Sequence, residues 1–457
     1  MNDEIYPLEP QEVPFVETEY RKIGTKIPVP ESIDILKQLR KVEPISMRGQ
    51  PLVVWDRADG YNVYDKWGNK WLDFSSGVLV TNAGHGREEI IDAITNIAQH
   101  GLLHNYCFPT EIRKDCCKAI LEFASRPYFE KVFLLTTGSE STECALKLAR
   151  TRAMEDGHDK KNIIVSFENA FHGRTLGAQL MGGIPSLKEW IRNPPSEFIQ
   201  VPFPDGFYNE NISFDEFEAA LEAKNVTTDQ VCGVITETYQ GGGADFLPVE
   251  YAKKLETWSR DNEIMLILDE VQAGFGRTGK KFGFEHYGIE PDLICMGKGI
   301  SSGLPVSGVM GKKAILDLYP PGSMTSTHTG NPLGCAAVIA NIELIQKEKL
   351  VENAANMGNL LASRMQEIVD TYDIAGVCHG KGLVAGLQIV EPGTKIPDKP
   401  MATRICKRII EKGVMMFSPV GKATLKICPP LCISEEPLIE ACDVIEQSIK
   451  ETLKEEK

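Results

Sequence analysis

Short apolar runs that alternate with longer helical stretches dominate the middle of this 457-residue chain. Five such runs are apparent, at 132–137, 163–167, 231–236, 265–269 and 293–296. Buried parallel strands have almost wholly apolar sequences because helices cover both faces of their sheet. The pattern therefore predicts an α/β fold with a large domain built on a mainly parallel sheet.

The two ends of the chain have other patterns. Strand-like runs at 52–55, 61–64 and 71–74 are separated by turn sequences and predict a small antiparallel meander. Beyond Asn331 the elements are segregated, and we expect helices at 333–370, 401–413 and 435–454, a Gly-rich strand region at 376–390, and a strand pair at 414–417 and 424–427. Segregated strands and helices are typical of an α+β domain.

These patterns predict two domains. Residues 76–332 form the large domain, residues 333–457 form a smaller α+β domain, and residues 1–75 are an N-terminal segment that belongs to the smaller one.

The composition argues against a nucleic-acid-binding, a membrane or a secreted protein. The net charge is −15, so no general attraction for nucleic acid or anionic membranes is expected. No apolar run approaches the roughly 20 residues that a bilayer requires. An acidic start without an apolar run after it, and 12 cysteines without a C-x-x-C pair, predict a cytoplasmic protein with reduced thiols.

Two acids, Asp269 and Glu270, follow the apolar run 265–268. Open α/β sheets bind their ligands at the carboxyl ends of the strands, so these acids are candidate site residues. The structural alternative is a helix cap or an ion pair with a basic residue at the surface.

Lys298 follows the next apolar run and lies between two glycines. Small neighbours leave room for a partner on its amine. Desolvation lowers the pKa of a lysine amine. The neutral amine is a nucleophile that forms Schiff bases with carbonyl groups.

Two further segments favour a ligand with a phosphate and a planar ring. Gly138 and Ser139 break one apolar run just before a predicted helix, whose free N–H groups and the serine hydroxyl suit an anion; the alternative is an ordinary turn with a serine cap. Phe171 precedes His172, and an aromatic side chain there suits stacking on a ring, although buried packing alone would also explain it.

Two other patterns do not fit their usual functions. Residues 274–279 match G-x-G-x-x-G, but they do not leave a strand directly, Lys281 replaces the Ser or Thr of a P-loop, and no good helix follows. The histidines and acids show no zinc spacing, so no metal is expected.

A single cofactor satisfies these features. A phosphate, a planar ring, a ring nitrogen that requires an acid and an aldehyde that requires a lysine together describe pyridoxal 5′-phosphate.

The chain resembles the class III pyridoxal-phosphate aminotransferases, the ω-amino-acid group of fold type I. The resemblance runs from about Leu52 to the C-terminal helix. Its most specific stretch is 266–279 with Lys298 following, and 137–143, 171–175 and 330–332 support it.

This resemblance implies roles for individual residues. Lys298 would hold the cofactor as a Schiff base and move the proton, and Asp269 would keep the ring nitrogen protonated. The other implied contacts are Val271 and Phe171 on the two ring faces, His172 beside Phe171, Gln272 at the ring hydroxyl, Gly138 and Ser139 at the phosphate with Thr327 from the other subunit, Glu237 near the cofactor, and Val78 at the substrate. It also implies a homodimer, with a tetramer left open.

Two positions depart from the pattern of the relatives that act on 4-aminobutyrate or ornithine. Gly242 stands where those relatives carry a second glutamate, and Lys426 stands where an arginine holds the substrate carboxylate. A lysine is a point charge that suits a sulfonate as well as a carboxylate. We therefore expect an ω-amino acid donor (taurine, β-alanine or 4-aminobutyrate) and 2-oxoglutarate or pyruvate as acceptor, unless Lys426 faces solvent.

Other reactions share this fold and cofactor. An aminomutase, which moves an amine within one molecule and needs no keto acid, is the main alternative, and decarboxylases and racemases are rarer ones. A non-catalytic relative is expected to have lost Lys298 or Asp269, and both are present.

Overall fold

The computed structural model describes residues 6–455 and divides into two compact units. The central unit is Glu88–Glu352, and the terminal unit combines the described residues up to Arg87 with those from Asn353 onward. The predicted domains divide the chain after residues 75 and 332, whereas the compact units divide it after Arg87 and Glu352.

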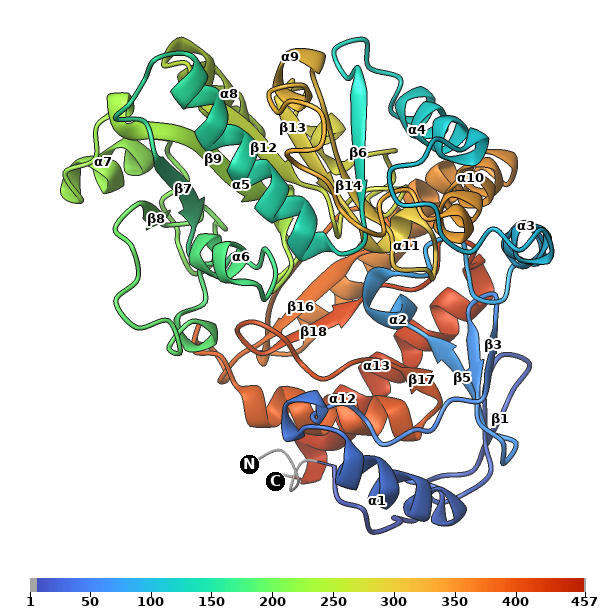
Figure 1. Ribbon diagram of the computed structural model, residues 1–457. Coiled ribbons are helices and arrows are strands. Elements are labelled where there is room, and N and C mark those ends of the chain that lie inside the picture. Colours follow the sequence, from blue (N-terminus) through green and yellow to red (C-terminus); the bar gives the residue numbers. More distant parts are fainter. Residues whose placement is uncertain (1–5, 456–457) are drawn as a thin grey trace. The chain divides into compact units, whose positions relative to one another are not determined.

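A seven-stranded sheet in the order β6-β14-β13-β12-β9-β7-β8 forms the centre of the central unit (Figure 1). Its strands are β6 (Lys131–Leu135), β7 (Ile163–Phe167), β8 (Phe198–Val201), β9 (Val231–Glu237), β12 (Met265–Asp269), β13 (Leu293–Met296) and β14 (Ser307–Gly311). The run from β13 to β8 is parallel, and β14 is antiparallel to both of its neighbours. The predicted α/β fold with a mainly parallel sheet is confirmed.

Helix α5 (Gly138–Glu155) lies across this sheet and packs on β14, β13 and β9 (Figure 1). Its apolar side chains form one core with the strands, including Leu148, Ile235 and Ile267. The other helices of the unit are α3 (Glu88–Gln99), α4 (Glu111–Ala124), α6 (Leu176–Met181), α7 (Asp215–Ala223), α8 (Val249–Asp261), α9 (Lys313–Leu316) and α10 (Pro332–Lys347), and a hairpin joins β10 (Tyr239–Gln240) to β11 (Asp245–Phe246).

The terminal unit contains two small sheets. The first has the order β1-β2-β5-β4-β3, with β17 parallel to β5. Its strands are β1 (Val16–Glu17), β2 (Lys22–Ile23), β3 (Arg57–Asp59), β4 (Asn62–Tyr64), β5 (Lys70–Asp73) and β17 (Val414–Met415). The second has the order β15-β16-β18, from β15 (Ala375–Gly380), β16 (Ala385–Ile389) and β18 (Thr424–Ile427). The helices are α1 (Ile33–Val42), α2 (Ser76–Leu79), α11 (Leu350–Thr371), α12 (Lys399–Glu411) and α13 (Glu435–Glu455).

Three expectations for the smaller elements were wrong. The run at 52–55 is not a strand, and the meander begins at β3 instead. The long helix expected at 333–370 is two helices, because Lys349 between α10 and α11 has a φ of 52°, which a right-handed helix does not accept. β17 and β18 do not pair with each other, since β17 joins β5 and β18 joins β16.

Within residues 6–455, no helix is both long and apolar enough to cross a membrane.

Candidate active site

Strand register brings the acids and Lys298 to one edge of the central sheet. In the parallel strands β9, β12 and β13, Glu237 lies beside Asp269 and Asp269 beside Cys295. Lys298 follows Cys295 by three positions, at the start of a short 3-10 helix, with a φ of 43°. The carboxyl ends of the strands therefore gather these residues as the sequence predicted.

Asp269 is buried and has two defined contacts. Its Oδ1 accepts a hydrogen bond from the Val271 backbone N–H at 3.0 Å, and its Oδ2 lies 2.8 Å from Nδ1 of His172. The alternative of an ion pair with a basic residue at the surface is wrong, because the partner is a buried histidine. An ionised carboxylate only accepts, so Nδ1 of His172 donates to it.

His172 has a second nitrogen with a different environment. Its Nε2 is buried and has no hydrogen-bond partner within residues 6–455. A doubly protonated ring would leave a buried N–H unsatisfied, which is costly. With its proton on Nδ1, His172 donates to Asp269 and leaves no buried N–H without an acceptor.

Glu237 is also buried, but its oxygens contact the backbone. One oxygen accepts the N–H of Phe171 at 2.9 Å, and the other accepts the N–H of Gly241 at 3.0 Å. Burial raises the pKa of Glu237 to about 7, and the charge of the neighbouring Asp269 adds to the rise. Glu237 therefore fixes the backbone that carries Phe171, a role that the sequence did not predict.

The predicted phosphate segment lies at the start of α5. Thr137 is the cap of this helix, with its hydroxyl accepting from Glu140 N–H, so the alternative of a serine cap is wrong. The Ser139 hydroxyl instead accepts from the Arg174 backbone N–H at 3.2 Å. The first N–H groups of α5 remain suited to an anion.

Two glycines approach Val271 closely. A Cβ on Gly138 would lie 2.9 Å from Val271 Cγ1, and a Cβ on Gly297 would lie 3.2 Å from the same atom. Gly138 at the start of α5 and Gly297 before Lys298 therefore let the backbone approach Val271 closely. The Gln272 side chain lies against Gly241, where an added Cβ would be 2.1 Å from its Nε2.

Phe171 and Thr327 are placed within the central unit. Phe171 is half-buried, with the Arg174 guanidinium 5.8 Å from its ring centroid. Thr327 is exposed and lines an open groove together with Glu140, Glu143 and other residues of α5. Neither placement tests the predicted ring and phosphate contacts, which stay predictions.

Lys426 and Val78 belong to the terminal unit. Lys426 is 2% exposed and pairs with Gly386 across β18 and β16, so the alternative that it faces solvent is wrong. Val78 is 47% exposed and lies in the left-handed turn α2. All four residues of α2 have positive φ, from 48° at Ser76 to 67° at Val78.

A buried pair of side chains adjoins this turn. Asp73 Oδ2 lies 2.7 Å from His85 Nε2, and Asp73 Oδ1 accepts from both the N–H and the hydroxyl of Ser75. Left-handed geometry persists in non-glycine residues only where the surroundings impose it. No local sequence signal predicted four such residues in a row, because Gly77 is the only glycine among them.

Replacing Val78 by glycine is expected to stabilise the protein by about 1 kcal/mol, because a left-handed residue with a Cβ is strained by roughly 1–2 kcal/mol. Urea unfolding measures the effect. Val80 has a right-handed φ of −100°, so Val80→Gly is the matched control and is expected to lower stability. A loss of stability in both variants would contradict the strain.

Glu270 directly follows Asp269 in the sequence, but its side chain has different hydrogen-bond partners. It is fully buried and accepts from the Thr238 hydroxyl, from Gly283 N–H at 2.8 Å and from Phe284 N–H at 2.7 Å. It thereby ties the end of β12 to the segment after the G-x-G-x-x-G match. Burial raises the pKa of Glu270 from 4.5 to about 7, and these hydrogen bonds oppose the rise.

This pKa predicts a pH-dependent difference between the wild type and Glu270→Gln. The folded protein binds the proton more tightly than the unfolded chain, so the wild type loses stability as pH rises from about 4.5 to 7. The glutamine variant avoids that loss, and its relative stability is expected to rise by about 3 kcal/mol across this range. Urea unfolding at pH 5 and pH 8, with the exposed Glu222→Gln as control, tests it; a difference independent of pH would contradict the shift.

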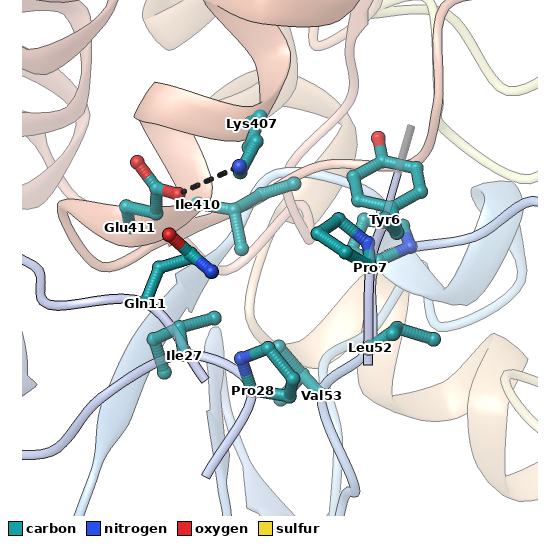
Figure 2. A pocket seen from close by; sticks show the side chains of 11 residues that line it. Tyr6, Pro7, Gln11, Ile27, Pro28, Leu52, Val53, Lys407, Ile410 and Glu411 are labelled. Atoms are coloured by element: carbon teal, nitrogen blue, oxygen red, sulfur yellow. Dashed lines mark ion pairs between the residues drawn. The ribbon is translucent and has the colours of Figure 1, made fainter. Parts of the chain in front are cut away.

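A small pocket of about 20 Å³, partly open to solvent, lies in the terminal unit. Figure 2 shows its apolar wall, from residues such as Ile27, Leu52 and Ile410, with the Lys407–Glu411 ion pair at one side. None of the predicted site residues lines it. In the described part of the chain, no three His, Cys, Asp or Glu side chains gather as metal ligands.

The site residues of the central unit fit the predicted cofactor. A buried carboxylate with hydrogen-bond contacts at both oxygens suits a basic ring nitrogen, the lysine just after the neighbouring strand suits an aldehyde, and the start of α5 suits a phosphate. A sequence model of the protein family aminotransferase class-III matches residues 45–449 of this chain. The chain belongs to the class-III aminotransferase family. It is an enzyme, and its cofactor is pyridoxal 5′-phosphate.

Individual relatives agree on the family but differ in activity. A 4-aminobutyrate aminotransferase of Mycobacterium leprae is 32% identical, over 93% of this chain and 97% of that one. An acetylornithine aminotransferase of Methanothermobacter thermautotrophicus is 33% identical, over 91% and 98%. An alanine/serine racemase of Pyrococcus horikoshii is 31% identical, over 95% and 94%. The solved structure of a Bacillus anthracis aminotransferase is 28% identical with a TM-score of 0.84, over 94% and 100%.

Proposed function

We propose that this class-III aminotransferase moves the amino group of an ω-amino acid to a keto acid, 2-oxoglutarate or pyruvate. The observation that carries the proposal is the buried contact of His172 with Asp269, which ends the strand next to the one that Lys298 follows. Aminotransfer requires a proton carrier and an acid beside the ring nitrogen, and we propose Lys298 and Asp269 for these two roles.

Each residue has a defined task in this proposal. When bound, pyridoxal phosphate supplies an electron sink for the bond that breaks next to the amine. The Lys298 amine would hold the cofactor until the substrate amine takes its place. The freed amine would then remove the proton from the substrate carbon that bears the amino group and later give that proton to another carbon. Asp269, oriented by the hydrogen bond from His172, would stabilise the positive charge of the ring nitrogen.

The remaining cofactor residues position the ring and the phosphate. Val271, fixed between Gly138 and Gly297, is proposed to pack on one ring face, and Phe171 on the other. Gln272 is proposed to approach the ring hydroxyl, and the N–H groups of Gly138 and Ser139 to bind the phosphate.

The acid group of the donor requires a cation. Burial of Lys426 favours pairing with an anion over solvation, and we propose that it recognises the carboxylate or sulfonate, with Val78 as a second substrate contact. Gly242, which stands where the relatives that act on 4-aminobutyrate or ornithine carry a second glutamate, lies in the hairpin between β10 and β11. The 4-aminobutyrate aminotransferase among the relatives makes 4-aminobutyrate the first donor to test, before β-alanine and taurine.

We also propose a homodimer that acts in the cytoplasm. Thr327 is exposed at the rim of a groove in the central unit, as a residue that serves the partner's phosphate would be. The neighbouring segment exposes Leu103 at 55% and Phe108 at 74%, which a second copy would cover. A tetramer is compatible with the same surface.

All 12 cysteines are free, which suits a reducing compartment such as the cytoplasm.

The relative named as an alanine/serine racemase supports a second candidate, a racemase. Racemisation, like the intramolecular transfer of an aminomutase, leaves the amine on its molecule and consumes no keto acid. Neither reaction converts the bound cofactor to its amino form at the end of a turnover.

The visible absorption spectrum of the purified holoenzyme tests these proposals. Single amines are added without a keto acid. We expect the visible band to bleach fully with 4-aminobutyrate, β-alanine or taurine and to return with 2-oxoglutarate or pyruvate. A band that persists with every ω-amine would contradict the proposed donor class, and inversion of alanine or serine without bleaching would establish the racemase.

A further inference from the structure

Glu143, in the second turn of α5, is an acid to which the proposed reaction gives no task. Its Oε1 accepts three hydrogen bonds from the segment 171–178, which contains the start of α6. The donors are the Thr175 hydroxyl at 2.7 Å, Gly177 N–H at 2.8 Å and Ala178 N–H at 3.2 Å. Thr175, the cap residue of α6, makes no capping bond with its own side chain. A residue of another helix therefore satisfies the first N–H groups of α6.

Two neighbours on the same face of α5 hold the same segment. The Ser139 hydroxyl accepts from Arg174 N–H at 3.2 Å, and the Thr142 hydroxyl donates to the carbonyl oxygen of His172 at 2.8 Å. Ser139, Thr142 and Glu143 are spaced i, i+3 and i+4, so they project from one side of the helix.

Close backbone approach makes this contact specific. A Cβ on Gly173 would lie 2.2 Å from the Ser139 hydroxyl oxygen, and a Cβ on Gly177 would lie 2.3 Å from Glu143 Oε2. Gly173 has a φ of 134° and also approaches the Ser139 backbone, so it accepts no side chain without displacing the segment, whereas a side chain at Gly177 would displace the Glu143 carboxylate. The segment is therefore seated against α5 along its length.

This seating determines where His172 lies. His172 reaches Asp269 at 2.8 Å through Nδ1, while its carbonyl group is held by Thr142 on α5. A shift of the segment away from α5 would lengthen the contact with Asp269. We propose that Glu143 is a positioning residue for the reaction, because its carboxylate fixes the segment 171–178 and thereby the hydrogen bond from His172 to Asp269. This inference rests on the proposed function of Asp269 and extends it to a residue that touches neither substrate nor cofactor.

Glu143→Ala holoenzyme tests the proposal by cofactor affinity and by the pH titration of the visible band. Loss of three hydrogen bonds to a carboxylate is expected to weaken pyridoxal phosphate binding by about 10- to 100-fold. With His172 displaced, Asp269 loses a hydrogen-bond donor and supports the positive charge of the ring less well, so the midpoint of the titration of the visible band is expected to rise by about half a unit or more. A role limited to stability would leave that midpoint unchanged.

Three further variants make the test decisive. Glu143→Gln keeps an acceptor oxygen and is expected to retain most of the affinity for pyridoxal phosphate. It replaces the alanine variant in the test if that variant does not fold. Thr175→Ala removes one of the three donors and is expected to have a smaller effect that is not additive with Glu143→Ala. Glu155→Ala, on the exposed end of the same helix, is the control and is expected to match the wild type.

The outcomes separate this inference from the proposed function. If the wild type bleaches with an ω-amine and Glu143→Ala matches Glu155→Ala in affinity and titration midpoint, the positioning role is overturned. If the wild type itself does not bleach, the proposed function fails, whatever the variants show.

Discussion

Lys298→Ala is expected to lose the visible band of the bound cofactor and at least about 10⁴-fold in the rate of amino transfer. The variant lacks both the amine that holds the cofactor and the group that carries the proton, and general acid–base catalysis alone contributes about 10²- to 10⁴-fold. Absorbance of the purified variant and single-turnover rates with 4-aminobutyrate measure the two losses.

The matched control is Lys280→Ala. Lys280 is exposed and follows the G-x-G-x-x-G match, so its loss is expected to leave band and rate at the level of the wild type. A Lys298→Ala variant that keeps the band, or a Lys280→Ala variant that loses it, would contradict the assignment of the lysine.

Asp269→Asn is expected to lower the rate of amino transfer by about 10²- to 10⁴-fold, because removing the charged partner of a buried cation costs about 3–5 kcal/mol. The amide keeps the size of the side chain and an oxygen that accepts from Val271 N–H, so folding is preserved. Rates of the donor half-reaction and thermal unfolding, compared in the same preparation, separate loss of chemistry from loss of structure.

Asp261→Asn, at the exposed end of α8, is the control for this variant and is expected to leave the rate unchanged. A loss of less than tenfold in Asp269→Asn, with the fold intact, would show that the ring nitrogen does not depend on this carboxylate.

The central sheet was predictable because its strands carry their signal locally. The runs at 163–167 and 293–296, for example, are buried strands at those positions. β14 was missed because its glycines and serine, Ser307–Gly311, break the apolar pattern. The pairing of β17 with β5 joins residues more than 300 positions apart, and no short window of sequence contains that information.

The site was predictable where spacing along the chain determines position. Asp269 ends β12 and Lys298 follows the end of the neighbouring strand β13 by two residues, so their approach follows from the fold. The contact of Glu143 with Thr175 and the backbone role of Glu237 depend on which helix face meets which segment. The left-handed turn of α2 arises from its surroundings, and its sequence holds only one glycine.

Transfer of the amino group can be followed through its nitrogen atom. Holoenzyme is incubated with ¹⁵N-labelled 4-aminobutyrate and unlabelled 2-oxoglutarate or pyruvate, and the ¹⁵N content of the products is measured by mass spectrometry. ¹⁵N-labelled β-alanine and taurine are tested in parallel. We expect the label to appear in glutamate or alanine at a rate that Lys298→Ala abolishes. A label that stays in the donor with all three amines, while the cofactor remains bound, would contradict this expectation.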